Sequence, residues 1–233
     1  MKIIMIDITF DVRSDCPGKD PDSHSLTLRN YHRLLWSKQL PNGKYLNLNE
    51  HLDNTTDAGH YEFSSDSIVH TLSMWKRMQP IVNQLSTNEL EHFRYLASTV
   101  GATTIFPRNR INGKNTINGE RGFNRKINDR IDLTLECIRR YYLGQNSPLF
   151  ECFKRYSDFF DLFVDFKGYV DFFLFQDLVS EDYSEIIYLH PFTDFSVNSY
   201  PKTLEEYLNY KSNTISFVGK RNNRIKKWCD DNL

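Results

Sequence analysis

The feature that most constrains this chain is a run of aromatic and aliphatic residues interrupted by charges, FFDLFVDFKGYVDFFLFQDLV at residues 159–179. Its length would suit a membrane-spanning helix, but it contains five charged residues, and each would cost several kcal/mol at bilayer depth. A simple membrane span is therefore excluded, and the run must be buried inside protein. We expect it to form part of an acidic, aromatic helical half that covers residues 147–195.

The size of the chain predicts one core. It has 233 residues, of which 39% are hydrophobic and 25% charged, and these values suit a single globular domain over residues 1–233. The four cysteines form no CxxC pair, which is typical of reduced thiols in an intracellular protein. The first ten residues lack the apolar core and cleavage site of a secretory signal. We therefore expect a cytoplasmic protein with no membrane partner.

Several short polar segments carry the signals of helix starts. The first helix is expected to reach about Trp36, and the second is expected to stop at Pro80. Two starts are capping boxes, Ser86 with Glu89 and Thr203 with Glu206, and the latter opens a basic C-terminal helix over residues 203–229. The expected helices follow Ser25, Ser65, Ser86, Asp129, Ser147 and Thr203.

Strand signals are fewer. Residues 2–10 alternate apolar and polar side chains, and residues 102–106 and 185–190 are short runs rich in β-branched and aromatic residues. Residues 44–62 are polar and show no clear pattern. The sequence therefore predicts an α+β fold, a helix-dominated single domain with a small mixed or antiparallel sheet.

The charges are distributed unevenly along the chain. The segment IFPRNRINGKNTINGERGFNRKINDR, residues 105–130, contains seven Lys and Arg against two acids, although the whole chain has a formal net charge of −1. By contrast, residues 151–194 contain ten acids and three bases. Such an asymmetry steers anions toward one face of a protein, and we call residues 105–130 the basic loop.

The composition of the basic loop favours phosphate binding. Its glycines allow close backbone approach to a ligand, turns of this kind present backbone N–H groups to anions, and arginine forks onto phosphate. Two other interpretations stay open, a solvated surface loop and a structural loop whose arginines pair with the acidic half. The predicted phosphate or nucleotide ligands are Arg108, Asn109, Arg110, Lys114, Asn115, Thr116, Asn118, Arg121 and Arg125.

The C-terminal helix adds a second basic segment. Residues 211–229 contain six bases and no acid, with Lys220, Arg224 and Lys227 on one helical face. If this helix lay beside the basic loop, the two would form a groove for a nucleic-acid strand.

Other titratable residues favour structural roles. Asp158, Asp161 and Asp165 share one helical face and are expected to be solvated rather than catalytic. His32 is expected to be a hydrogen-bonded residue of the partial core and Trp36 a core residue. Glu136 could face the basic loop and orient one of its arginines.

A metal site is not expected. Asp20, Asp22 and His24 alternate, but the spacing of a calcium loop or a zinc site is absent. These side chains are expected to satisfy turns and helix caps instead. No cofactor and no catalytic residue can be assigned from spacing.

Three segments together resemble an uncharacterised family of bacterial proteins, a domain of unknown function. They are DPDSHSLTLRNYHRLLWSKQLPNGK, TINGERGF and DRIDLTLECIRRYYLG, and the segments FKGYVDFFLFQDLV and RNNRI fit the same family. The resemblance runs over nearly the whole chain. It implies a single-domain unit of bacterial or phage origin, and it implies no activity and no site residues.

Two functions follow as expectations. The first is an intracellular protein that binds a nucleotide or nucleic-acid phosphate through the basic loop, and that could process this ligand as an effector in conflict between bacteria and phages. The second is a non-catalytic regulatory or interaction module, an inhibitor or subunit, which meets a protein partner through its aromatic acidic half.

Overall fold

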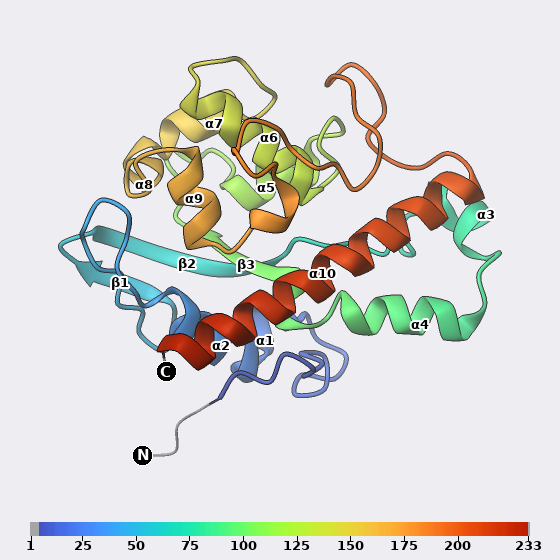
Figure 1. Ribbon diagram of the computed structural model, residues 1–233, viewed down its shortest axis with the longest axis horizontal. Helices are drawn as coiled ribbons and strands as arrows, with labels where there is room; N and C mark the ends of the chain where they lie inside the picture. The colour runs from blue at the N-terminus through green and yellow to red at the C-terminus, as the bar shows by residue number, and fades with distance from the viewer. Residues whose placement is uncertain (1–4, 233) are drawn as a thin grey trace.

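The structure, a computed structural model that describes residues 5–232, is a small sheet with helices on both sides (Figure 1). Helices α1 and α2 pack on β2, and α5 packs on β3 below the cluster of α6, α7, α8 and α9. The helices and strands are α1 (Pro21–His24), α2 (Leu26–Trp36), β1 (Asp53–Thr56), β2 (Gly59–Ser67), α3 (Gln79–Val82), α4 (Thr87–Leu96), β3 (Thr103–Pro107), α5 (Ile117–Phe123), α6 (Ile131–Tyr142), α7 (Phe150–Arg155), α8 (Ser157–Asp161), α9 (Phe166–Phe172) and α10 (Leu204–Asn232), with 3₁₀ turns η1 (Lys76–Met78), η2 (Val100–Ala102) and η3 (Gln176–Leu178). The α+β class with a small antiparallel sheet is confirmed.

The sheet has three antiparallel strands in the order β1-β2-β3. A hairpin joins β1 to β2, with Thr56 opposite Gly59, and Ser65 on β2 pairs with Ile105 on β3. The helix expected after Ser65 is therefore wrong, because β2 continues through Ser67 and its backbone pairs with β3. The unpatterned residues 44–62 contain β1 and the start of β2, so the sequence did not reveal this hairpin.

Three long helices, α2, α4 and α10, begin at their expected starts. Ser25 Oγ accepts a hydrogen bond from Leu28 N at 3.0 Å at the start of α2, and α2 ends at Trp36 as expected. The capping box of α4 is complete. Glu206 accepts a hydrogen bond from Lys202 N and donates its own N–H to Thr203 Oγ1 at the start of α10. These starts were predictable because a cap needs only neighbouring residues.

Four further expectations based on local pattern are wrong. Of the strand expected over residues 2–10, the described residues 5–10 form turns and coil, and the others lie outside the described residues. Residues 185–190 contribute one isolated bridge, between Val179 and Ile186. Helix α7 begins at Phe150, after a turn closed by Ser147 O. Asp129 does not cap α6, whose N-cap is Arg130.

The aromatic half forms a large part of the core. Phe153 and Phe160 are fully buried with ring centroids 4.8 Å apart, and Tyr169 and Phe173 lie 4.9 Å apart. Asp158, Asp161 and Asp165 are exposed, so the expectation of a solvated face is confirmed. None of the helices within residues 5–232 is long and apolar enough to cross a membrane.

Helix α10 runs across the molecule and contacts α4, η2 and η3 (Figure 1). Its buried side chains recur every three or four residues, which places them on one stripe. Asn222 accepts a hydrogen bond from Gly101 N at 2.8 Å, and Arg221 donates to the carbonyl oxygens of Thr103 and Phe173. The helix thereby connects the start of β3 to the aromatic half.

Candidate ligand-binding site

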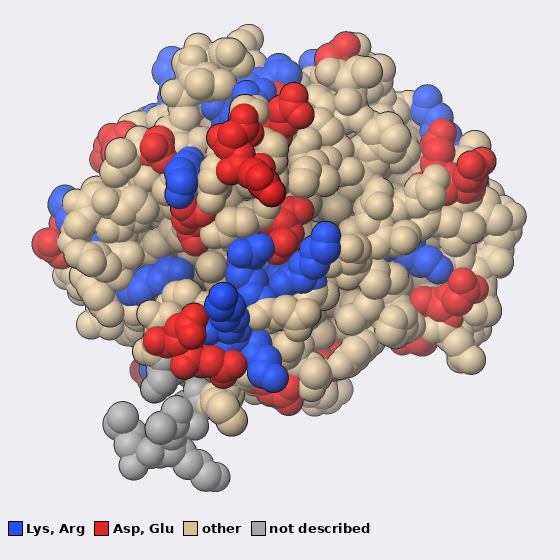
Figure 2. Space-filling model, viewed as in Figure 1, with Lys and Arg blue, Asp and Glu red and all other residues tan. Residues whose placement is uncertain are grey.

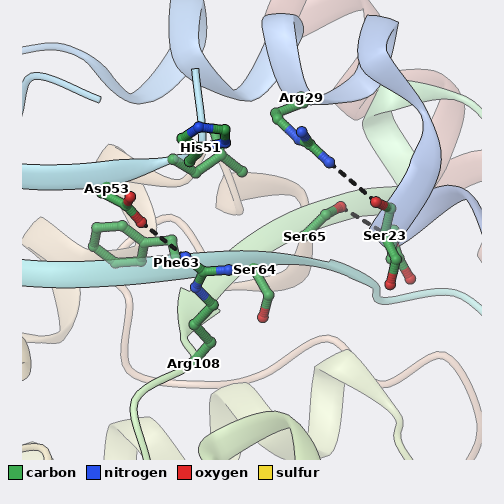
Figure 3. A pocket seen from close by; sticks show the side chains of 10 residues that line it. Ser23, Arg29, His51, Asp53, Phe63, Ser64, Ser65 and Arg108 are labelled. Carbon is green, nitrogen blue, oxygen red and sulfur yellow. Dashed lines mark hydrogen bonds and ion pairs between the residues drawn. The ribbon is translucent and has the colours of Figure 1, made fainter. Parts of the chain in front are cut away.

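A cavity of about 470 Å³ lies between the sheet and helices α1 and α2 (Figure 3). Ser23 and Arg29 come from the helices, Ser64 and Ser65 come from β2, and Arg108 follows the end of β3. These groups are up to 85 residues apart in number, so the cavity exists only after folding. The lining residues are Asp22, Ser23, Arg29, His51, Leu52, Asp53, Phe63, Ser64, Ser65 and Arg108.

Arg108 is the one predicted ligand among the residues that line this cavity. Its Nη2 lies 3.0 Å from Asp53 Oδ1 and its Nε lies 3.4 Å from Glu62 Oε2. The side chain is nevertheless 45% exposed. A guanidinium has five N–H donors, so these two contacts tether Arg108 without using its full capacity for hydrogen bonds.

The helix side of the cavity carries a second guanidinium. Arg29 Nη2 donates to the carbonyl oxygen of Ser23 at 3.0 Å (Figure 3). Asp20 caps α1 by accepting from Asp22 N, which confirms that this acidic segment satisfies turns and caps. Within residues 5–232, no group of three or more His, Cys, Asp or Glu is arranged to hold a metal ion.

A chain of hydrogen bonds runs from the core to the cavity. Trp36 Nε1 donates to His32 Nδ1 at 3.0 Å, so the other ring nitrogen, Nε2, carries the hydrogen and donates to Ser65 Oγ at 2.9 Å. Ser65 Oγ then donates to Asp22 Oδ1 at 2.9 Å. Burial lowers the pKa of His32 to about 3, so its ring is neutral, and the buried roles expected for His32 and Trp36 are confirmed.

The Asp22 carboxyl is held at the cavity by this chain. Its second oxygen accepts a hydrogen bond from Ser67 N at 3.0 Å. Burial raises the pKa of Asp22, and the hydrogen bond from Ser65 opposes that rise only in part. Asp22 is thus a fixed carboxyl with a raised pKa that lines the same cavity as Arg29 and Arg108.

Arg121 lies away from the cavity and is fully buried. It forms ion pairs with Asp66 and with Asp129, the latter at 3.2 Å, and donates to Thr134 Oγ1 at 2.9 Å. His70 Nε2 lies 3.1 Å from Asp129 Oδ2 and completes the cluster. The prediction that Arg121 is a phosphate ligand is corrected, because the carboxylates of the protein itself surround its guanidinium.

Three other predicted ligands have structural partners. Asn109 Oδ1 accepts from Glu62 N at 3.0 Å, and Thr116 caps α5 by accepting from Gly119 N. Asn118 Nδ2 lies 3.4 Å from Ser64 Oγ, on the cavity wall. The basic loop is therefore more ordered than expected, because residues 117–123 of it form α5.

The remaining predicted ligands, Arg110, Lys114, Asn115 and Arg125, are exposed. None of the three cations among them lies within 4.0 Å of a carboxylate of residues 5–232. They do not line the cavity. The structure thus divides the nine predicted residues among the cavity, the core and the open surface.

The predicted groove between the basic loop and the C-terminal helix is not formed. Arg221 of α10 is buried against Thr103, the first residue of β3, whereas the exposed part of the loop follows the last residue, Pro107. Figure 2 shows Lys and Arg gathered over the C-terminal half of α10 with Asp and Glu beside them. One such pair is Arg224 with Asp177, at 2.9 Å.

Glu136 also differs from its expected role. It is buried and pairs with Arg139 at 2.9 Å and with Arg140 at 2.6 Å, one helical turn away on α6. It therefore orients arginines of its own helix and none of the basic loop.

Most of the residues that line the cavity were not predicted as ligands from the sequence. Asp22 was noticed only as part of a metal-like alternation, and Arg29 lies on a helix whose start was predicted. Asp53, Ser64 and Ser65 belong to strands that the sequence did not reveal. A strand prediction over residues 59–67 would have shown that Phe63 and Ser65 share one face.

The comparisons with known proteins give one match. The model of a family of unknown function (DUF6994) matches residues 6–225, which include the cavity, the basic loop and most of α10. No curated protein and no solved structure matches the chain.

Proposed function

The chain belongs to this family of unknown function, and we propose from its geometry that it binds a small phosphate-bearing ligand of the nucleotide class in the cavity between α1, α2 and the sheet. The observation that carries the proposal is the presence of two guanidiniums, Arg29 and Arg108, on different elements around one cavity (Figure 3). Guanidiniums bind phosphate oxygens with two parallel hydrogen bonds.

The size and polarity of the cavity suit such a ligand. Pockets for small molecules range from about 300 to 1,000 Å³, and this one measures about 470 Å³. The Ser23 hydroxyl also lines the cavity, and it can turn its hydrogen from Asp20 Oδ2 to a phosphate oxygen. An incoming phosphate competes with Asp53 and Glu62 for Arg108, and solvent weakens both pairs because they are partly exposed.

The carboxylates favour a nucleotide over inorganic phosphate. Asp22 and Asp53 line the same cavity, and carboxylates of this kind accept hydrogen bonds from ribose hydroxyls in nucleotide-binding proteins. A ligand with an anionic part and a hydroxyl-bearing part matches a cavity that carries both charges.

The two other expected partners have less support. A nucleic-acid strand would need the groove that α10 and the basic loop do not form. A protein partner on the aromatic half would need a patch of exposed apolar side chains there, and among residues 147–195 the large hydrophobic residues that are exposed are Val164 and Ile187, at two separate positions. The proposal therefore concerns a small ligand.

The test is a binding assay with matched variants. Nucleoside mono-, di- and triphosphates, inorganic phosphate and a short single-stranded RNA and DNA are titrated by calorimetry at two salt concentrations. We expect Arg29→Gln and Arg108→Gln each to weaken nucleotide binding by about tenfold or more, since a charge-assisted hydrogen bond contributes about 1.5–3 kcal/mol. We expect Arg110→Gln and Arg125→Gln to bind like the unaltered protein.

The controls separate the cavity from the loop. If the Arg110 and Arg125 variants lose binding while the cavity variants keep it, the ligand lies on the exposed loop. If no nucleotide binds, the proposal fails. Thermal unfolding of each variant shows whether it is folded. We expect little change in Tm, because Arg29 is only half-buried and Arg108 is exposed.

Asp22 favours a second candidate, an enzyme that acts on the bound nucleotide. A fixed carboxyl with a raised pKa is suited to act as a general base in a cavity that two arginines also line. Product formation is followed by phosphorus NMR in the same samples, and Asp22→Asn would then keep binding and lose turnover. A role for such a reaction in conflict between bacteria and phages stays a prediction from the sequence.

A further inference from the structure

A second cavity, of about 520 Å³, lies between the segment that follows α2 and the segment that joins α8 to α9. Lys38 and Pro41 line it on one side, and Phe163, Val164 and Phe172 line it on the other. The described residues of this cavity and of the cavity around Arg29 and Arg108 do not overlap. The proposed nucleotide site therefore leaves it unexplained.

The Lys38 amine has an unusual environment in this cavity. Its Nζ donates to the carbonyl oxygen of Phe172 at 2.7 Å. It also lies 4.6 Å from the ring centroid of Phe172, 4.9 Å from that of Trp228 and 5.1 Å from that of Trp36. Lys38 forms no ion pair with a carboxylate in the part of the chain that the structure describes.

The acids of the same cavity are engaged elsewhere. Asp171 pairs with Lys167 and accepts from Tyr183 Oη at 2.7 Å. Asp165 caps α9 by accepting from Gly168 N at 2.7 Å. The amine is therefore surrounded by aromatic rings and one carbonyl group rather than by a compensating negative charge.

The surroundings favour the neutral amine. Burial lowers the pKa of Lys38 to about 7, and the positive charge of Arg221 on α10 acts in the same direction. The nearby Cys229 thiol acts in the opposite direction, and the three rings attract an ammonium, yet the burial of the amine outweighs them. A lysine in such an environment is nucleophilic at neutral pH.

The cavity wall is also built in an unusual way. Val164 has a left-handed backbone with φ of 70°, which a β-branched residue seldom adopts. Gly168 lies so close to the backbone just before α9 that a Cβ there would overlap the carbonyl oxygen of Phe163. Strained backbone of this kind persists where the surrounding structure holds it, and such positions cluster at functional sites.

We propose that Lys38 is a nucleophile that forms an imine with an aldehyde or ketone bound in this cavity. The Nζ lone pair attacks the carbonyl carbon. The amine nitrogen loses its two hydrogens, which pass to the carbonyl oxygen through solvent, and this oxygen leaves as water. A C=N bond replaces the C=O bond, and no oxidant or reductant is needed. The apolar walls formed by Leu40, Pro41 and Phe172 suit a carbonyl compound with a small apolar body.

The test is competitive labelling of the unaltered protein. Butanal and sodium cyanoborohydride convert any imine to a stable alkylated lysine, and peptide mapping by mass spectrometry gives the rate at each site. At pH 7 we expect Lys38 to react about tenfold or more faster than Lys167, which lines the same cavity but is exposed and paired with Asp171. The rate at Lys38 should level off above about pH 7.

Three results would overturn the proposal. One is faster labelling of Lys167 and the surface lysines than of Lys38, and another is labelling of Lys38 only in urea. The third is a rate at Lys38 that keeps rising to pH 10, as for an ordinary lysine. A folded Lys38→Arg variant should lose the fast adduct while Lys167→Arg keeps it, and the labelling of the unaltered protein decides the matter if the first variant does not fold.

Discussion

At the scale of single residues, the arginines of the basic loop lie in three different environments. Arg108 lines a cavity, Arg110 is exposed, and Arg121 is buried between Asp66 and Asp129. The cluster around Arg121 also includes His70. It holds together residues 66, 70, 121 and 129, so its ion pairs connect β2 to the end of the basic loop.

Asp129 is held in this cluster at a conformational cost. It and Asn128 both have left-handed backbone, with φ of 59° and 50°, which non-glycine residues adopt infrequently. Burial would raise the pKa of Asp129, but Arg121 and His70 hold it below its ordinary value. The ion pairs thus add to the tolerance of Asn and Asp for this backbone conformation.

The pH dependence of stability tests the pair of His70 and Asp129. Burial alone would lower the pKa of His70, but the hydrogen bond and charge of Asp129 raise it above its ordinary value of about 6.5. A group with a raised folded-state pKa contributes its full stability below the unfolded-state pKa and loses it as pH rises through the folded-state pKa. We therefore expect the unaltered protein to lose more stability above about pH 6.5 than His70→Asn does.

Urea unfolding of both proteins between pH 5.5 and pH 9 measures this difference. Asp66 faces the same pair. Burial raises the pKa of Asp66 to about 7 and the charge of His70 lowers it, so the difference between the two proteins reports the titration of His70 together with its effect on Asp66. Parallel stability curves for the two proteins would show that His70 does not carry a proton in this pair.

At the scale of elements, helix starts follow from neighbouring residues, whereas turns and strand bounds depend on distant contacts. Helix α9 illustrates both, because Asp165 caps it locally while Gly168 on its first turn packs against Phe163 and Pro41. The cap could be found in the sequence. The close approach could not, since it depends on the fold of the whole aromatic half.

Replacement of two helical glycines by alanine should change the free energy of unfolding in opposite directions. Gly168→Ala forces its Cβ into the Phe163 carbonyl oxygen, and we expect a loss of about 1–3 kcal/mol in the free energy of unfolding. Gly219→Ala lies in the interior of α10 with open space at its Cβ, and we expect a gain of up to about 1 kcal/mol. Urea unfolding at one pH measures both, and equal effects of the two changes would contradict the packing seen at Gly168.

At the scale of the whole molecule, α10 joins the two parts of the core. Asn222 accepts from Gly101 N and donates to Thr99 Oγ1, while Arg221 donates to backbone carbonyl oxygens of η2, β3 and α9–η3. Helix α10 is the last element of the chain and η2 precedes it by about a hundred residues. Its docking therefore couples segments that are distant in sequence.

Asn222→Ala should weaken this coupling. It leaves the buried Gly101 N–H without its acceptor, and we expect a loss of about 1–3 kcal/mol in the free energy of unfolding. The neighbouring Asn223→Ala is exposed and should change stability by less than about 0.5 kcal/mol. Hydrogen exchange should show faster exchange at Gly101 and over β3 in the first variant alone.

Indistinguishable exchange in the two variants would mean that Asn222 does not hold α10 in place. A loss confined to the last turns of α10 would mean that the helix frays without affecting the rest of the core.

The sequence by itself determined the class of fold, the starts of α2, α4 and α10, and the burial of the aromatic half, because caps and hydrophobic periodicity act over a few residues. Only the tertiary structure decided which arginine lines a cavity, which is buried and which meets solvent. The physical reason is that each outcome depends on partners far along the chain, as Arg108 with Asp53 and Arg121 with Asp66 illustrate. The β1–β2 hairpin that supplies those carboxylates left no clear local pattern, so the positions of the charges could not be read before the fold was known.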